Sequence, residues 1–143
     1  MLSKEAHKEW NIHFWNGFKN EMKSFPSSNG KRINWLTYPT DVKNVYLRMV
    51  CGKDFVALNF DIQFNDQGIR DIVWEQMEEL KGLINTQMNY PSEWHRGIQT
   101  KEGLVIDQIS WKLDNANYLN EVNWAIIYEF YKNRIIAFDK FHQ

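Results

Sequence analysis

Three carboxylates could support metal-dependent chemistry, and they are Asp41, Asp61 and Glu21. Two carboxylates can hold Mg²⁺, and a lysine two positions after one of them would help to position or activate water for hydrolysis. Gln63 occupies that position after Asp61. Because glutamine cannot supply the positive charge, the hydrolytic arrangement is incomplete. We therefore predict no catalytic residue, and the three carboxylates are kept as candidates for an alternative, enzymatic function.

The residues around Asp61 alternate in polarity, as in a strand with one buried face. Even-numbered positions from Val56 to Phe64 are apolar, whereas the odd positions from 59 to 63 are polar. If the preceding strand pairs with this one, its polar positions join them in one patch. An antiparallel sheet commonly leaves one face to solvent, but tyrosine and arginine are also frequent in binding hot spots. Two interpretations stay open, a solvated face or a binding surface for a protein or peptide formed by Tyr46, Arg48, Asn59, Asp61 and Gln63.

No other group of residues has the spacing of a metal or cofactor site. The four histidines are scattered, and His7 and His13 lie on different faces of a helix rather than at the i, i+4 spacing of a metal pair. The turn at residues 27–30 lacks the glycine-rich pattern that cradles phosphates. Cys51, the single cysteine, cannot form an internal disulfide and fits a reducing compartment. We predict no cofactor and a cytoplasmic location.

The composition indicates one domain with an aromatic core. The chain has 143 residues, about the length of one domain. Its 17 basic and 18 acidic residues nearly cancel, so nucleic-acid binding is possible but has no support from net charge. Nowhere do 18 consecutive apolar residues occur, so no membrane partner is expected. Aromatic residues make up 15% of the chain, which predicts a core or an interface built from rings.

The first half of the sequence predicts a helix followed by three strands. Ser3 could cap a helix that ends before Pro26 and carries apolar residues at helical spacing. Strand-like runs follow at residues 31–38, 44–51 and 54–64. Their connections are too short for parallel crossovers, so we expect an antiparallel meander.

The second half predicts a helix, a hairpin and a long final helix. Asn65 or Asp66 could cap the helix. Two runs at 93–98 and 103–113 predict a hairpin, and Asn120 could cap a last helix that reaches residue 141. The expected fold is a single α+β domain over residues 1–143, with helices packed on an antiparallel sheet. The apolar stripe of the middle helix would consist of Ile69, Ile72, Val73, Met77, Leu80, Leu83 and Ile84.

The final helix has an apolar arc of about 200 degrees, wider than one covered face requires. Either the helix is wedged between the sheet and another helix, or part of the arc contacts a second chain in a homodimer. Arg134 falls inside this arc. Since a lone buried charge is costly, we expect its guanidinium to reach solvent or to pair with a carboxylate such as Asp61, Asp107 or Glu21.

Several segments resemble an uncharacterised bacterial family that is known only as a domain of unknown function. They are FWNGFKNEM, KRINWLTYPTDVKNVYLRM, EWHRG and NRIIAFDKF, within about residues 10–141. These motifs are aromatic packing patterns, so the resemblance implies no catalytic residue. Members of that family occur alone or C-terminal to restriction-endonuclease-like domains, which implies a role near DNA metabolism or phage defence.

Two classes of function follow. The first is a non-catalytic interaction or accessory module with an unknown protein partner, because no nucleophile, metal cluster or cofactor loop is complete. The second is a divergent or degenerate PD-(D/E)xK-like nuclease, because the order of helix, three strands, helix and strand is also the core order of those enzymes. The nuclease needs Asp41, Asp61 and Glu21 to converge around one metal ion.

Overall fold

The computed structural model describes residues 3–143 and has an α+β fold with one antiparallel sheet. The sheet order is β1-β2-β4-β3, so β1 and β3 form its edges. In chain order the elements are α1 (Lys4–Met22), a 3₁₀ turn (Trp35–Thr37), β1 (Val45–Cys51), β2 (Phe55–Ile62), α2 (Gln67–Glu79), α3 (Lys81–Met88), β3 (Glu93–Gln99), β4 (Val105–Asp114), a 3₁₀ turn (Glu121–Asn123) and α4 (Trp124–His142).

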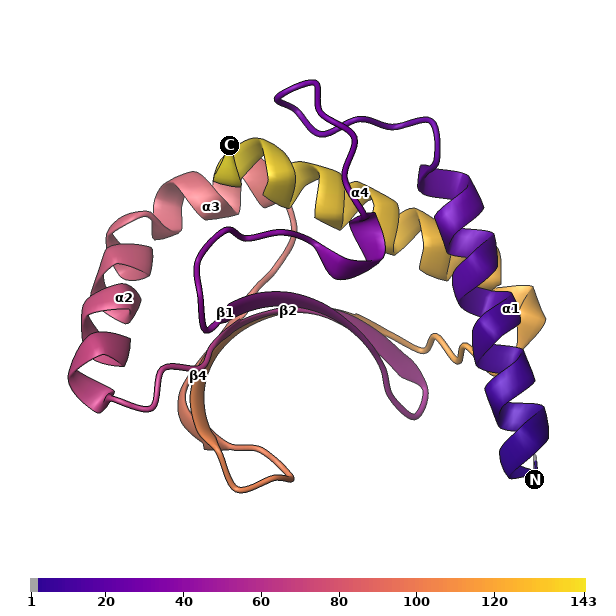
Figure 1. Ribbon diagram of the computed structural model, residues 1–143, viewed down its shortest axis with the longest axis horizontal. Coiled ribbons are helices and arrows are strands. Elements are labelled where there is room, and N and C mark those ends of the chain that lie inside the picture. Colours follow the sequence, from indigo (N-terminus) through magenta and orange to yellow (C-terminus); the bar gives the residue numbers. More distant parts are fainter. Residues whose placement is uncertain (1–2) are drawn as a thin grey trace.

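The sheet is strongly curved, and the helices lie on its convex side (Figure 1). α4 runs across the top of the sheet, with α1 at one end and α3 and α2 at the other, and all four helices of residues 3–143 lie on this convex side. The predicted inner face of β2 is confirmed, since Leu58, Phe60 and Ile62 are buried under the helices. The ring of Phe60 lies 5.4 Å from that of Phe138 in α4. Aromatic side chains therefore build the contact between sheet and helix, as the composition predicts.

The first helix is confirmed, and its N-cap is Ser3, whose hydroxyl accepts a hydrogen bond from the Ala6 amide. Phe14, Phe18 and Met22 bury the apolar stripe of α1. The strand predicted at residues 31–38 is wrong, because this segment is a loop that contains the 3₁₀ turn.

The loop at 31–38 turns because its side chains satisfy the local backbone. The Asn34 side chain accepts from the Leu36 amide, and the indole of buried Trp35 donates to the Phe25 carbonyl. These contacts are made within the segment and with Phe25, three residues after the end of α1. The sheet consequently starts with a β1-β2 hairpin instead of a three-stranded meander, and β4 of the second hairpin pairs with β2.

The middle helix differs from the prediction in two respects. It divides at Leu80 into α2 and α3, and Asp66, not Asn65, is its N-cap. The predicted stripe is also only partly buried: Met77 and Ile84 are buried, but α2 additionally buries Trp74, which packs edge-on against Trp94 of β3 at 5.4 Å. Burying this large ring leaves several aliphatic side chains on the outside. The exposed ones are Ile69, Ile72, Leu80 and Leu83.

The wide apolar arc of α4 is mostly buried inside the chain, against the sheet, α1 and α3. Of the two alternatives expected for Arg134, an ion pair with a carboxylate does not occur among residues 3–143, and Arg134 is half-buried. Its guanidinium donates to the Met88 carbonyl at the end of α3 and lies over the Tyr90 ring. The C-terminus of a helix carries a partial negative charge, so a cation is stabilised there. A homodimer through α4 stays a prediction. Among residues 3–143 no helix, α4 included, is long and apolar enough to cross a membrane.

Replacing Phe60 with alanine should lower the free energy of unfolding by about 3–5 kcal/mol, because the ring is buried against α4. Asn59→Ala, on the opposite face, should cost about 1–2 kcal/mol, since the Ser110 hydroxyl that donates to Asn59 Oδ1 loses its acceptor. Urea unfolding of both variants measures the difference. Equal losses would mean that the two faces of β2 are assigned wrongly.

Candidate functional site

The five residues predicted to bind a partner lie on the concave face of the sheet. The register of β1 and β2 places Tyr46 opposite Asp61 and Arg48 opposite Asn59. β4 extends this face, with Gln108 opposite Asp61 and Ser110 opposite Asn59. Gln63 follows β2 directly, and its backbone amide donates to the Asn44 carbonyl.

Asp61 on this face is buried and hydrogen-bonded. Its side chain accepts from Gln108 Nε2 at 2.8 Å and lies 3.7 Å from Arg48 Nη1. Burial raises the pKa of the carboxyl group, and the Gln108, Arg48 and Gln63 side chains act in the opposite direction. The curl of the sheet excludes water from its centre, so Asp61 is neither a solvated side chain nor an open ligand.

The three candidate catalytic carboxylates lie on different elements. Asp61 is on β2, Asp41 lies in the turn before β1 with a φ of 60°, and Glu21 is exposed in the last turn of α1. Over residues 3–143 no three His, Cys, Asp or Glu side chains are grouped so that they could hold a metal ion. The arrangement that a nuclease would need is therefore not formed by Asp41, Asp61 and Glu21.

The edge strand β1 turns part of its backbone away from the sheet. The bonds from the Gln63 amide to the Asn44 carbonyl and from the Gly52 amide to the Phe55 carbonyl direct the even-numbered residues towards β2. The odd-numbered peptide groups point outwards. The Val45 amide donates to the Val42 carbonyl, and the Val45 carbonyl accepts from the Thr40 hydroxyl. For Leu47 and Met49 no such partner occurs within the described part of the chain.

A groove of about 360 Å³ lies beside this open edge. One wall is formed by the loop that includes the 3₁₀ turn, and the other by β1. The groove is lined by Leu36, Thr37, Tyr38, Tyr46, Leu47, Arg48, Met49 and Gln63. Unpaired backbone groups and a partly apolar groove thus occur side by side, which the sequence did not reveal because the segment at 31–38 was predicted to be a strand.

Asp139 in α4 fixes the loop that forms the outer wall of the groove. Its carboxylate is almost fully buried and accepts from the Tyr38 hydroxyl at 2.6 Å, the Ser28 amide at 2.6 Å and the Ser27 hydroxyl at 2.9 Å. Burial acts to raise the pKa of Asp139, but the hydrogen bonds from Tyr38, Ser28 and Ser27 outweigh it and lower the pKa. Asp139 was not among the residues predicted from the sequence. An acid inside the apolar arc of the final helix was the available signal.

The chain belongs to the family described as domain of unknown function DUF4268, whose match covers residues 11–143. Membership agrees with the resemblance carried by the aromatic motifs. No curated protein and no solved structure is significantly similar to the chain. The functional inference therefore rests on the geometry of the molecule.

Replacing Asp139 with asparagine should reduce stability by about 1.5–3 kcal/mol near neutral pH, the range for hydrogen bonds to a charged group. Because the pKa of Asp139 is lowered in the folded state, its contribution is present above the unfolded pKa of about 3.9. The contribution is lost as the pH falls through the folded pKa. Urea unfolding as a function of pH should show the two proteins converging in acid. A matched control is Asp114→Asn on the exposed end of β4, and an equal loss in this variant would contradict the assignment.

Proposed function

We propose that the chain is a non-catalytic interaction module that binds an extended segment of a partner protein along the edge strand β1. The observation that supports this proposal is the outward pair of peptide groups at Leu47 and Met49 beside the groove of about 360 Å³. A peptide that adds a strand to a sheet edge gains affinity from main-chain hydrogen bonds and specificity from side-chain pockets. Natural proteins usually protect such edges, so an open one needs a function.

Tyr46 and Arg48 would give the peptide its specificity. The Tyr46 side chain is 45% exposed, and Arg48 has 59% of its side chain in solvent. The ion pair from Arg48 to Asp61 is long, at 3.7 Å, and the Arg48 side chain is largely in solvent, so a carboxylate of a partner can reach the guanidinium while Gln108 still donates to Asp61. We expect a segment with an acidic residue opposite Arg48 and an apolar residue directed towards Leu36 and Met49 in the groove.

The proposed setting is the bacterial cytoplasm, near DNA metabolism or phage defence, as the resemblance to the family implies. A partner could be a separate protein or a restriction-endonuclease-like domain of the same polypeptide. A separate partner is favoured over a second copy bound through α4, because α4 buries most of its arc within the chain.

Amide hydrogen exchange of the free protein should alternate along β1. The amides of Tyr46, Arg48 and Val50 point to β2 and should exchange at least about tenfold more slowly than those of Leu47 and Met49. Peptides selected from a random display library should protect the Leu47 and Met49 amides when bound. Tyr46→Ala and Arg48→Ala should weaken binding, whereas the control Lys101→Ala, in the β3-β4 turn, should not. A selected peptide that leaves both amides unprotected would show that the binding surface lies elsewhere.

The purified protein should not cleave DNA or RNA in the presence of Mg²⁺ or Mn²⁺. The reason is that Gln63 stands where the mechanism needs lysine and that Asp61 is engaged by Gln108 and Arg48. Gel assays with single- and double-stranded substrates measure the activity. Metal-dependent cleavage that disappears in Asp61→Ala would establish the nuclease alternative instead.

A further inference from the structure

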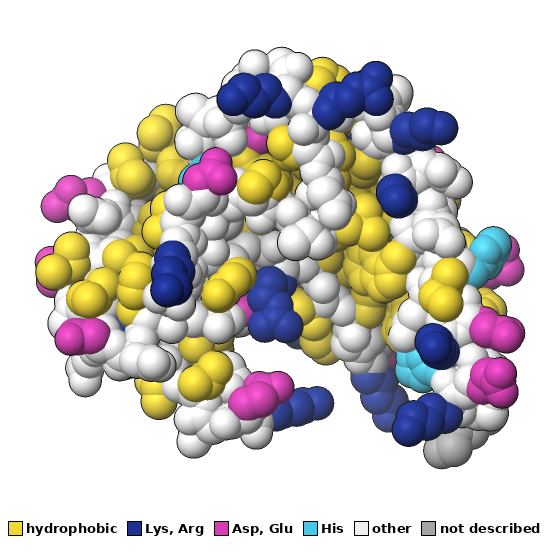
Figure 2. Space-filling view, viewed as in Figure 1, with side chains coloured by type: hydrophobic (Ala, Val, Ile, Leu, Met, Phe, Trp, Pro, Cys, Tyr) yellow, Lys and Arg dark blue, Asp and Glu magenta, His cyan; other side chains and the backbone are white. Residues whose placement is uncertain are grey.

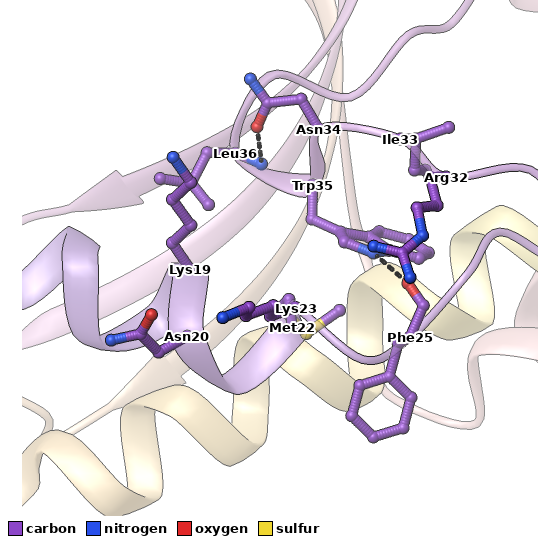
Figure 3. Close-up of a pocket in the computed structure, with 10 residues that line it drawn as sticks. All are labelled: Lys19, Asn20, Met22, Lys23, Phe25, Arg32, Ile33, Asn34, Trp35 and Leu36. Atoms are coloured by element: carbon purple, nitrogen blue, oxygen red, sulfur yellow. Dashed lines mark hydrogen bonds between the residues drawn. The ribbon is translucent and has the colours of Figure 1, made fainter.

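A second hollow lies between the last turn of α1 and the loop that follows it, and its volume is about 590 Å³. Figure 3 shows the side chains of the last turn of α1 and of the loop around this hollow, with the Trp35 indole beside Arg32 and hydrogen-bonded to the Phe25 carbonyl. The lining residues are Lys19, Asn20, Met22, Lys23, Phe25, Arg32, Ile33, Asn34, Trp35 and Leu36. This volume falls within the range of about 300–1,000 Å³ that is usual for sites of small organic ligands.

The charge of this pocket is one-sided. Lys19, Lys23 and Arg32 line it, and no aspartate or glutamate does. None of the three takes part in an ion pair with another of residues 3–143. The Phe25 ring, which belongs to the lining, carries a further cation, since Lys132 Nζ of α4 lies 4.3 Å from its centre. Basic side chains are visible along the top of the molecule in Figure 2, over the end of α1 and the following loop.

The nearest acid on α1, Glu21, is exposed and lies two positions from both Lys19 and Lys23. Side chains two positions apart do not face each other on a helix, and Glu21 is not among the residues that line the pocket. Glu21 is therefore not placed to neutralise Lys19 and Lys23. Lys19, Lys23 and Arg32 therefore line the pocket without an acidic side chain among its lining residues, and a bound anion would be attracted to all three.

The walls of the pocket are ordered by internal hydrogen bonds. The Trp35 indole donates to the Phe25 carbonyl at 2.8 Å, and Asn34 Oδ1 accepts from the Leu36 amide at 3.1 Å. The amide nitrogens of Asn20 and Asn34 remain as further donors at the rim. Met22, Ile33 and Leu36 supply an apolar surface that a naked inorganic ion would not use. The pocket thus combines cations, neutral donors and an apolar wall.

We propose that this pocket binds an organic phosphate of nucleotide size, with Lys19, Lys23 and Arg32 on its phosphate groups and its organic part against Met22, Ile33 and Leu36. Arginine provides a planar pair of donors for phosphate oxygens, and lysine provides a mobile point charge. The pocket shares Leu36 with the β1 groove, but its other lining residues are different, and its cations do not take part in the proposed peptide binding. The phosphates can belong to a free nucleotide or to the end of a nucleic acid chain.

Calorimetric titration of the full chain at low and at physiological salt tests this assignment. The probes are adenosine triphosphate, inorganic tripolyphosphate, adenosine and a short single-stranded oligonucleotide with a 5′-phosphate. We expect saturable binding of the triphosphate, weaker binding of tripolyphosphate and none of adenosine. The double variant Lys23→Gln/Arg32→Gln should weaken the triphosphate by at least about tenfold, the effect of losing about 1.4 kcal/mol.

The matched control is Lys53→Gln/Lys101→Gln, which removes the same charge from two exposed turns of the sheet. This control should leave the affinity unchanged and shows whether net charge alone explains binding. Preferential binding of the oligonucleotide, lost in the pocket variant only, supports the site and assigns the phosphates to nucleic acid. Equal losses in both double variants, or no saturable binding of any phosphate probe, would overturn the proposal. Thermal unfolding of each variant confirms that it is folded.

Discussion

The arrangement of the whole upper half of the molecule depends on the burial of one carboxylate. Asp139 is buried on the face of α4 that the loop covers, where an unpaired charge would have a high free-energy cost. The charge is tolerated because Ser27, Ser28 and Tyr38 donate hydrogen bonds to the carboxylate. These donors come from a loop that has little regular structure of its own. The requirement to satisfy Asp139 therefore determines where that loop lies on α4.

Both candidate sites share this loop. Residues from Phe25 to Leu36 form one side of the basic pocket, and residues from Leu36 to Tyr38 form the outer wall of the β1 groove. The donors to Asp139 stand near the two ends of the segment, at Ser27 and Tyr38. Loosening of that anchor would alter the shape of both hollows, which links two surfaces that are otherwise on different elements.

The curvature of the sheet explains why its concave face is polar without being wet. Curling brings the side chains of neighbouring strands together on the inner side, so Asp61 and Ser110 are buried although the four helices of residues 3–143 lie on the convex side. Each then needs a partner on the same face, which Gln108 and Asn59 provide. The exposed part of this face is at its margin, where Tyr46 and Arg48 border the groove.

The sequence alone determined the features that depend on local periodicity and capping. Ser3 and Asp66 cap helices, the alternation from Val56 to Ile62 separates the two faces of β2, and the wide arc of α4 predicts a helix covered on more than one side. These patterns act within a few residues of the chain, so they can be read without knowing its neighbours. The five polar residues on β1 and β2 share a face for the same reason.

Tertiary structure decided what depends on long-range competition. The segment at 31–38 has the alternation of a strand, but Trp35 and Tyr38 find hydrogen-bond partners in Phe25 and Asp139, so the loop lies beside β1 instead of pairing with it. α2 buries Trp74 in preference to part of its aliphatic stripe because Trp94 of a distant strand offers a larger contact. The groove and the basic pocket arise where segments far apart in sequence meet, and no local pattern encodes such a meeting.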